Sequence, residues 1–236
     1  MPEIIIPAQD GRSFSAYIAL PARLPAPAVI MIQEIFGVNA EMRAKCDHMA
    51  NLGFVAIAPD LFWRMEPGVQ LTDQTEGEWA KAFDFLNRFD IEQGILDLRM
   101  TLHTMRGHAQ TTGTVGCVGY CLGGKLAYLM AARTKIDCAV SYYGVGLEDL
   151  LDEAAAITKP LMLHIAAEDK FVSKAAQDKI KTALSGHPQV TLHSYPGADH
   201  AFSRLHGQHY DEAAASLANQ RTEAFLKTTL KLEKAA

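Results

Sequence analysis

The chain has 236 residues, 49% hydrophobic and 21% charged, with a formal net charge of −5. This balance excludes a disordered or fibrous protein, and the lack of a basic run argues against a nucleic-acid partner. No apolar run reaches the 18 or so residues of a membrane helix, and the first residues lack signal-peptide features, so we expect a cytoplasmic protein. The spacing of Cys46, Cys117, Cys121 and Cys138 fits neither a disulfide framework nor a zinc site.

The elements predicted along the chain begin with a β-hairpin and continue as alternating strands and helices. Asp10-Gly11 is a turn-forming pair between the first two strands. The predicted strands cover residues 3–7, 13–20, 28–33, 54–58, 114–118, 137–142, 160–166 and 190–195. The predicted helices cover residues 39–51, 76–89, 91–106, 122–133, 173–184 and 211–231. Residues 61–75 show little pattern.

This alternation predicts the fold class. Short apolar runs between helices are typical of a mostly parallel, doubly wound sheet, here with an antiparallel hairpin at its N-terminal end. We expect one such domain over residues 1–236. The ligand site of such a sheet lies beyond the carboxyl ends of its strands. Reactive side chains are therefore expected directly after strands.

The motif with the clearest chemistry is Gly-Tyr-Cys-Leu-Gly at residues 119–123. It follows a predicted strand and begins a predicted helix, which makes it the G-x-S-x-G nucleophile elbow of α/β-hydrolases with cysteine in place of serine. Its two glycines allow a sharp turn, and the helix N-terminus favours an anionic thiolate on Cys121. The alternative is a small buried cysteine on a glycine-rich turn.

An elbow of this kind needs an acid and then a histidine further along the chain. Asp169 directly follows a predicted strand and is our choice for the acid, with Glu168 as the second choice. His200 lies in a turn-rich segment just beyond the last strand, where a general base is expected. We predict the triad Cys121, His200 and Asp169, in which the acid orients the imidazole and stabilises its charged form.

An oxyanion hole is expected beside the elbow. In α/β-hydrolases one donor comes from the loop after the first core strand, and the other is the residue after the nucleophile. Here these are the backbone N–H groups of Ile35 and Leu122. Loss of one such donor typically costs roughly 10²–10³ in rate.

Five segments resemble the dienelactone hydrolase family, also called carboxymethylenebutenolidase: QEIFGVNAEMR, APDLF, GYCLGGKLA, YYGVGL and GADHAF. The resemblance implies the same triad and adds Glu34 as a residue that contacts the cysteine. A carboxylate beside a thiol disfavours the thiolate. We therefore hypothesise that Glu34 keeps Cys121 protonated until substrate displaces it. The alternative is an exposed glutamate at a strand end.

The family holds a substrate carboxylate with two arginines and a serine. Arg204 matches one arginine, whereas Trp79 stands at the position of the other and Ala201 at that of the serine. An indole in place of a bidentate donor weakens carboxylate recognition and favours an apolar or aromatic group. Arg64 and Arg88 are the other possible sources of positive charge.

Several aromatic side chains are expected to line the pocket with Trp79, although core packing explains each of them equally well. They are Phe36, Phe62, Phe83 and Tyr142.

The resemblance implies a cysteine-dependent hydrolase of ester or lactone bonds, of the type that converts dienelactone to maleylacetate through an acyl-enzyme. Its expected partner is a small-molecule ester or lactone, with no metal or organic cofactor, no nucleic acid and no membrane. A monomer or small homo-oligomer is expected. Two alternatives stay open: a broader carboxylesterase or thioesterase on the same scaffold, and a catalytically silent homologue that binds or regulates.

Overall fold

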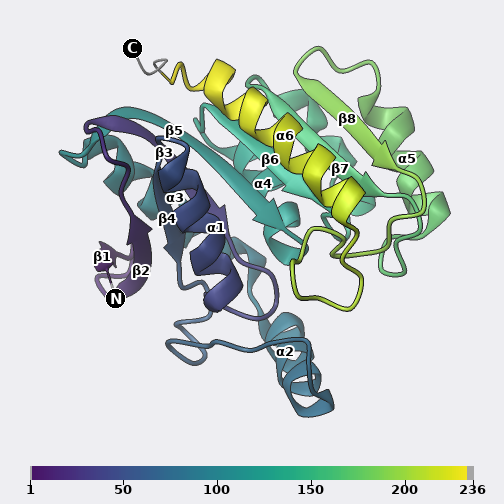
Figure 1. The fold of residues 1–236 in the computed structure, drawn as a ribbon, viewed down its shortest axis with the longest axis horizontal. Helices are drawn as coiled ribbons and strands as arrows, with labels where there is room; N and C mark the ends of the chain where they lie inside the picture. Colours follow the sequence, from purple (N-terminus) through teal and green to yellow (C-terminus); the bar gives the residue numbers. More distant parts are fainter. Residues whose placement is uncertain (1, 233–236) are drawn as a thin grey trace.

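A computed structural model describes residues 2–232, and its centre is an eight-stranded sheet in the order β1-β2-β4-β3-β5-β6-β7-β8 (Figure 1). The strands are β1 (Glu3–Pro7), β2 (Ser13–Ala19), β3 (Ala26–Ile32), β4 (Val55–Pro59), β5 (Thr111–Tyr120), β6 (Cys138–Tyr142), β7 (Leu161–Ala166) and β8 (Val190–Tyr195). The pairs β1–β2 and β2–β4 are antiparallel, and all other neighbours are parallel. The predicted mostly parallel sheet with an antiparallel hairpin is confirmed.

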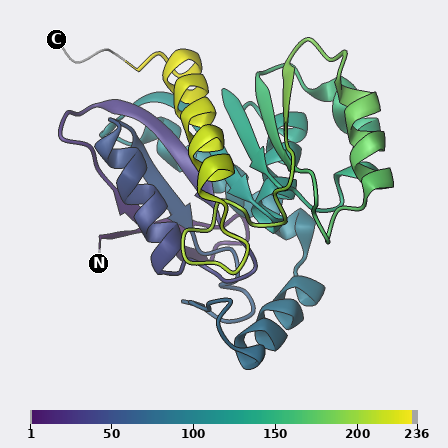
Figure 2. The same cartoon turned by 45° about the vertical axis from the view of Figure 1, so that its right-hand side comes forward.

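Helices cover both faces of this sheet. They are α1 (Ala40–Asn51), α2 (Glu76–Arg88), α3 (Ile91–Gly107), α4 (Leu122–Arg133), α5 (Lys174–Leu184) and α6 (Glu212–Thr229), with two short 3₁₀ helices, η1 (Leu147–Asp149) and η2 (Leu151–Ala156). Helices α1 and α6 lie side by side on one face, and α3, α4 and α5 on the other (Figures 1 and 2). Helix α2 lies beyond the sheet, at the carboxyl ends of its parallel strands (Figure 1).

The parallel strands at the centre of the sheet form the core. Every residue of β3, β4, β6 and β7 is buried, as expected for strands covered on both faces. Because these strands are closely packed, the segments that leave their carboxyl ends start from fixed positions. Across residues 2–232 we find no helix with the length and apolar character needed to cross a bilayer.

The structure differs from the sequence prediction mainly at element ends. Strand β3 starts two residues earlier than predicted because Ala26 already donates to the Gln110 carbonyl of the segment before β5. Strand β5 starts at Thr111, ahead of Gly113, whose φ of 86° breaks the regular pattern. The two 3₁₀ helices after β6 were not predicted, because such short elements carry no periodicity.

The N-terminus of α4 differs from those of the other α-helices of the described chain. Five of them begin at a side chain that caps a backbone N–H, namely Asn39, Thr75, Asp90, Ser173 and Asp211. The N-cap of α4 is Cys121, and it makes no such hydrogen bond. The first turn of α4 therefore keeps its N–H groups available to another partner.

Candidate active site

Cys121 occupies the sharp turn between β5 and α4, as the nucleophile-elbow motif predicts. Its φ of 57° and ψ of −115° are strained values for a residue with a side chain. A Cβ atom on Gly119 would lie 1.8 Å from the Gly123 carbonyl oxygen, and one on Gly123 would lie 2.3 Å from that of Ile32. The turn therefore forms only with glycine at both positions, and the strain it imposes falls on Cys121.

Two backbone N–H groups near Cys121 are available as oxyanion-hole donors. The amide of Leu122 begins α4, and that of Ile35 lies in the turn after β3. Within residues 2–232 neither amide has a hydrogen-bond acceptor, whereas the amide of Cys121 itself donates to the Tyr142 carbonyl at 3.0 Å. Both predicted donors are thus free, as an oxyanion hole requires.

His200 and Asp169 form a buried pair beside the elbow. Asp169 Oδ2 lies 2.9 Å and Oδ1 3.1 Å from His200 Nδ1. Asp169 Oδ1 also accepts the backbone N–H groups of Phe171 and Val172, at 2.8 and 3.1 Å, so the carboxylate is held in one orientation. With Nδ1 bound to the acid, Nε2 is the ring nitrogen left for the Cys121 side.

The surroundings of His200 favour its charged form. Burial acts to lower the pKa of His200, but the nearby Cys121 sulfur and the hydrogen-bonded carboxylate of Asp169 raise it to about 10. The imidazole lies between two aromatic rings, with ring centres 4.8 Å away for Phe171 and 5.0 Å for Tyr143. This geometry supports an imidazolium that faces the sulfur.

Glu34 makes no hydrogen bond to Cys121 among the described residues. Its Oε2 accepts a hydrogen bond from Arg204 Nε at 2.8 Å, and its buried Oε1 has no hydrogen-bond partner among the described residues. Arg204 Nη1 donates to Asp73 Oδ2, also at 2.8 Å. The expected contact between Glu34 and Cys121 therefore stays a prediction, for a state other than this one.

A cavity of about 140 Å³ opens directly onto Cys121 and His200. Its walls are mostly apolar and include much of the aromatic set predicted from the sequence. The lining residues are Ile35, Phe36, Trp79, Phe83, Leu86, Cys121, Val145, Phe171, His200 and Arg204. A hydrolytic site needs this combination of a reactive group and a shaped apolar recess.

Two predicted aromatic contacts with this cavity are not found. The Tyr142 side chain points toward α6, where its hydroxyl lies 2.7 Å from Thr222 Oγ1 and 3.1 Å from Asn219 Oδ1. It therefore does not line the cavity. The neighbouring Tyr143 takes the place beside His200 because its φ of 38° turns the chain at the end of β6. Phe62 stacks on Phe85 in the core, with ring centres 4.9 Å apart.

The charged alternatives also lie elsewhere. Glu168, the second choice for the acid, is exposed and pairs with Lys174 at 2.9 Å. Arg88 pairs with Asp84 on the surface of α2. Arg64 is bound by Asp97 and Asp10, so neither arginine adds charge to the cavity.

Sequence reasoning missed one acidic residue of the site, Asp73. It lies in the segment before α2 that showed little pattern, and it is 4% exposed. Its partner Arg204 is 131 residues further along the chain, so no local spacing links them. A buried acid in a polar loop would have been the available signal, but burial is not visible in the sequence.

Comparison with known proteins identifies the family. The sequence profile of the dienelactone hydrolase family matches residues 14–230. The chain belongs to the dienelactone hydrolase family. A protein of Azospirillum brasilense is 50% identical over 232 residues, which cover 98% of this chain and 100% of that protein. The carboxymethylenebutenolidase of Pseudomonas putida is 40% identical over 223 residues, 94% of each chain.

The solved structures agree on the fold. A Klebsiella pneumoniae protein superposes with a TM-score of 0.83 at 29% identity, covering 94% of this chain and 95% of that one. An esterase of Pyrococcus furiosus has a TM-score of 0.73 at 16% identity, covering 97% and 92%, and so supports the fold alone. The family member described here therefore has the α/β-hydrolase fold and is a hydrolase that acts on ester or lactone bonds, as the sequence predicts.

Proposed function

We propose that this family member cleaves a small lactone or ester through a thioester formed on Cys121. The observation that carries the proposal is the convergence of three distant segments on one cavity: the elbow at Cys121, His200 after β8, and Asp169 after β7. A strained sulfur that lines a cavity, beside a buried imidazole paired with a carboxylate, is the arrangement of an activated nucleophile.

The chemical steps follow from these positions. The Cys121 thiolate attacks the carbonyl carbon, and the carbonyl oxygen becomes an oxyanion that the Ile35 and Leu122 amides stabilise. As the ring or ester C–O bond breaks, protonated His200 gives its proton to the leaving oxygen. Neutral His200 then takes a proton from water, the hydroxide attacks the thioester, and the carboxylic acid leaves with regeneration of the thiolate. Asp169 keeps the proton-bearing Nδ1 fixed throughout.

Glu34 is proposed to act at the start of this cycle. Its unpartnered Oε1 is a free acceptor near the predicted oxyanion hole. In a state where its bond to Arg204 is broken, this carboxylate would keep Cys121 protonated. The rate of alkylation of Cys121 across pH, in wild type and Glu34→Gln, tests this, because an identical pH profile in the two proteins removes Glu34 from the mechanism.

A substrate panel tests the function itself. It contains cis- and trans-dienelactone and simple aryl esters, with wild type, Cys121→Ala and Cys121→Ser. We expect hydrolysis by wild type and none by Cys121→Ala. Iodoacetamide should label Cys121, which lines the cavity, and leave the fully buried Cys46, Cys117 and Cys138 unlabelled. Hydrolysis that survives in Cys121→Ala contradicts the cysteine mechanism, and a wild type inert on every substrate supports the silent-homologue alternative.

A broader carboxylesterase is the second candidate, and the apolar lining around Trp79 favours it. Faster turnover of aryl esters than of both dienelactones would select it. The expected cytoplasmic location and the monomer or small homo-oligomer also stay proposals. Cell fractionation and light scattering, respectively, test them.

A further inference from the structure

Arg204 lies at the wall of the catalytic cavity between two buried carboxylates. Its Nε binds Glu34 and its Nη1 binds Asp73, each at 2.8 Å, and the side chains of the two acids are 11% and 4% exposed. The guanidinium also lies over the Phe36 ring, 4.8 Å from its centre. One cation is thus shared by two anions, and the cluster carries a net negative charge.

Asp73 remains a carboxylate at neutral pH. Burial acts to raise its pKa, but the hydrogen bond from Arg204, the charge of Arg204 and further hydrogen bonds hold it below the usual value. The further donors are the side-chain amide of Gln74 at 2.6 Å and the backbone N–H of Gln208 at 3.3 Å. The second negative charge at Arg204 is therefore permanent near neutral pH.

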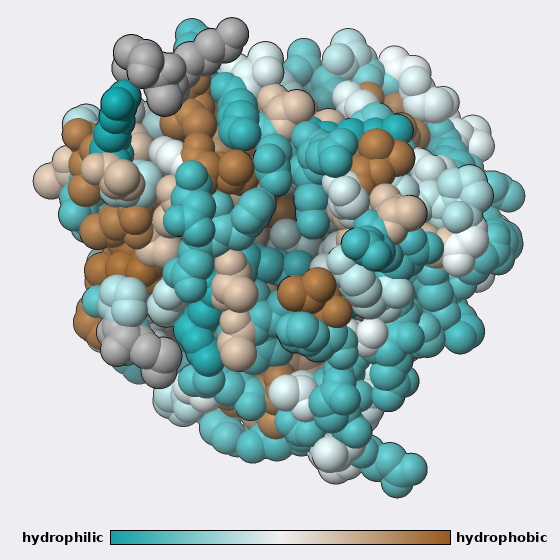
Figure 3. Space-filling model, viewed as in Figure 1, coloured by the Kyte–Doolittle hydropathy of each residue, from teal (hydrophilic) through white to brown (hydrophobic). Residues whose placement is uncertain are grey.

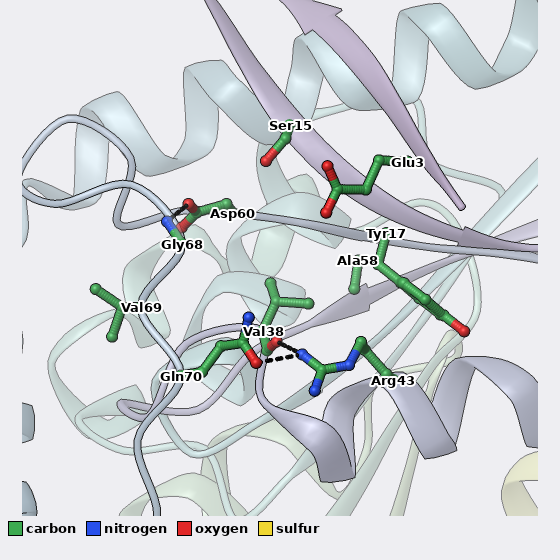
Figure 4. A pocket seen from close by; sticks show the side chains of 10 residues that line it. All are labelled: Glu3, Ser15, Tyr17, Val38, Arg43, Ala58, Asp60, Gly68, Val69 and Gln70. Carbon is green, nitrogen blue, oxygen red and sulfur yellow. Dashed lines mark hydrogen bonds between the residues drawn. The ribbon is translucent and has the colours of Figure 1, made fainter. Parts of the chain in front are cut away.

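The segment that carries Asp73 is anchored before it reaches the cavity. Asp60 Oδ2 accepts the Gly68 N–H at 2.7 Å, and Arg43 Nη1 donates to Gln70 Oε1, also at 2.7 Å; Figure 4 shows both contacts around a small pocket. Asn39 Nδ2 then donates to the Leu71 carbonyl at 2.9 Å. Asp73 is therefore held in place and does not swing away from Arg204 at low cost.

Asp73 also fixes the aromatic wall. Its backbone carbonyl accepts the indole N–H of Trp79 at 3.0 Å, so the polar edge of that ring is already bound. Trp79 then packs edge-on against Phe36 and stacks on Phe83, with ring centres 5.1 and 5.5 Å apart. Among the residues that line the cavity, Arg204 is the one arginine or lysine, and its charge is already compensated.

We propose that Asp73 is a specificity-determining residue: it neutralises Arg204 and orients Trp79, so that the cavity selects a neutral ester or lactone with an aromatic or other apolar group beside the scissile carbonyl. The inference rests on the proposed hydrolase function and names its substrate class. A substrate carboxylate placed in this cavity loses water and meets a wall of net negative charge.

Arg204 still has one donor nitrogen for a substrate. Its Nη2 makes no hydrogen bond within the described part of the chain. A donor group whose positive charge is already compensated suits a neutral carbonyl or hydroxyl oxygen, whereas a carboxylate is bound best by an uncompensated, bidentate guanidinium. The cavity therefore recognises an apolar ring that carries a neutral acceptor.

A matched pair of substrates tests the inference. The pair is the para-nitrophenyl esters of para-methylphenylacetic acid and para-carboxyphenylacetic acid, which differ in a methyl group against a carboxylate remote from the reacting carbonyl. We expect wild type to prefer the neutral ester by about tenfold or more in kcat/KM, the size of one uncompensated charge at this range. Equal rates, or a preference for the carboxylate, overturn the proposal.

Two variants separate charge from shape. Asp73→Asn keeps the size of the side chain and removes one anion, so the neutral-to-acidic ratio of kcat/KM should fall about tenfold. Trp79→Arg adds an uncompensated cation and should lower the ratio further. Ala80→Arg, one residue along on the exposed side of α2, makes the same change in total charge and should leave the ratio unchanged.

The neutral-to-acidic ratio of kcat/KM distinguishes failure of the proposal from damage to the fold. Damage to the fold lowers both rates together and leaves the ratio in place, so a folded Asp73→Asn protein with an unchanged ratio contradicts the role of Asp73. If Asp73→Asn does not fold, an equal ratio in Trp79→Arg and Ala80→Arg overturns the proposal instead. Failure of the hydrolase function looks different, because neither ester is then cleaved by wild type.

Discussion

Two cavities lie on either side of the segment 203–205. Arg204 lines the catalytic cavity, whereas Ser203 and Leu205 line a groove between α1 and α6, on the largely hydrophilic face seen in Figure 3. The groove is the larger of the two, about 260 Å³ against about 140 Å³. Volume alone would therefore place the site in the groove, and the chemistry places it in the smaller cavity.

The difference lies in how the polar groups are satisfied. In the groove the charges bind one another: Lys45 lies 3.3 Å from Glu41, and His48 lies 3.0 Å from Glu223. In the catalytic cavity a strained cysteine lies beside a buried histidine whose pKa is raised, and the nearby amides of Ile35 and Leu122 have no acceptor within residues 2–232. Strain and unbound donors mark a reactive site because they cost stability unless a ligand uses them.

Loss of the nucleophile should have the largest effect, and it tests whether the active site lies in the cavity at Cys121 or in the groove. Cys121→Ala removes the atom that forms the thioester, so kcat/KM should fall ~10⁴-fold or more with little change in melting temperature. His48→Ala, the matched change in the groove, should retain wild-type activity because its ion pair is exposed. Measurement of kcat/KM for both variants on one ester distinguishes the two sites. The reverse pattern would move the active site to the groove.

The acid is the next test. Asp169→Asn should lower kcat by about 10³–10⁴-fold, because an amide no longer holds the reactive tautomer or stabilises the imidazolium. Glu168→Gln removes the neighbouring charge, which is exposed and paired with Lys174, and should change kcat by less than about twofold. Steady-state kinetics at neutral pH compare the two. Similar losses in both variants would contradict the assignment of Asp169.

Much of this site was predictable because it is encoded locally. The spacing of Gly119, Cys121 and Gly123 between an apolar strand and an apolar helix predicts the elbow. Asp169 and His200 lie in the segments that follow β7 and β8. The carboxyl ends of parallel strands meet at one edge of a sheet, so these positions imply their own convergence. The same periodicity gave the order and type of the regular elements.

The rest depends on contacts between segments with no shared pattern. Asp73 reaches Arg204 only because the segment 61–73 folds back over the turn after β3, where the Leu71 N–H binds the Phe36 carbonyl. Tyr143 rather than Tyr142 flanks His200 because the end of β6 adopts a positive φ, and a one-residue change reverses which face a side chain occupies. Neither the contact between Asp73 and Arg204 nor the position of Tyr143 can be predicted from composition or residue spacing.

The pH dependence of stability sharpens the comparison between the two histidines. The pKa of His200 is raised in the folded protein to about 10, so its contribution to the free energy of unfolding is complete below its ordinary pKa of about 6.5 and is lost as pH rises toward 10. Relative to His200→Gln, wild type should lose on the order of 4 kcal/mol between pH 6 and 9.5. Urea unfolding at the two pH values measures this difference. His48→Gln should follow wild type, and a His200→Gln protein that does so too would contradict the buried imidazolium.

The smallest expected effect lies in the wall between the cavities. The Tyr143 hydroxyl lies 2.8 Å from Ser203 Oγ, joining the ring beside His200 to the residue that faces the groove. Tyr143→Phe keeps the ring and removes this buried hydrogen bond, so stability should fall by about 1 kcal/mol and kcat by a few-fold. In a double-mutant cycle with Ser203→Ala the two changes should cost less together than their sum, because they remove the same bond. Full additivity would show that the wall does not couple the cavities through this pair, and that the groove has no influence on His200 by this route.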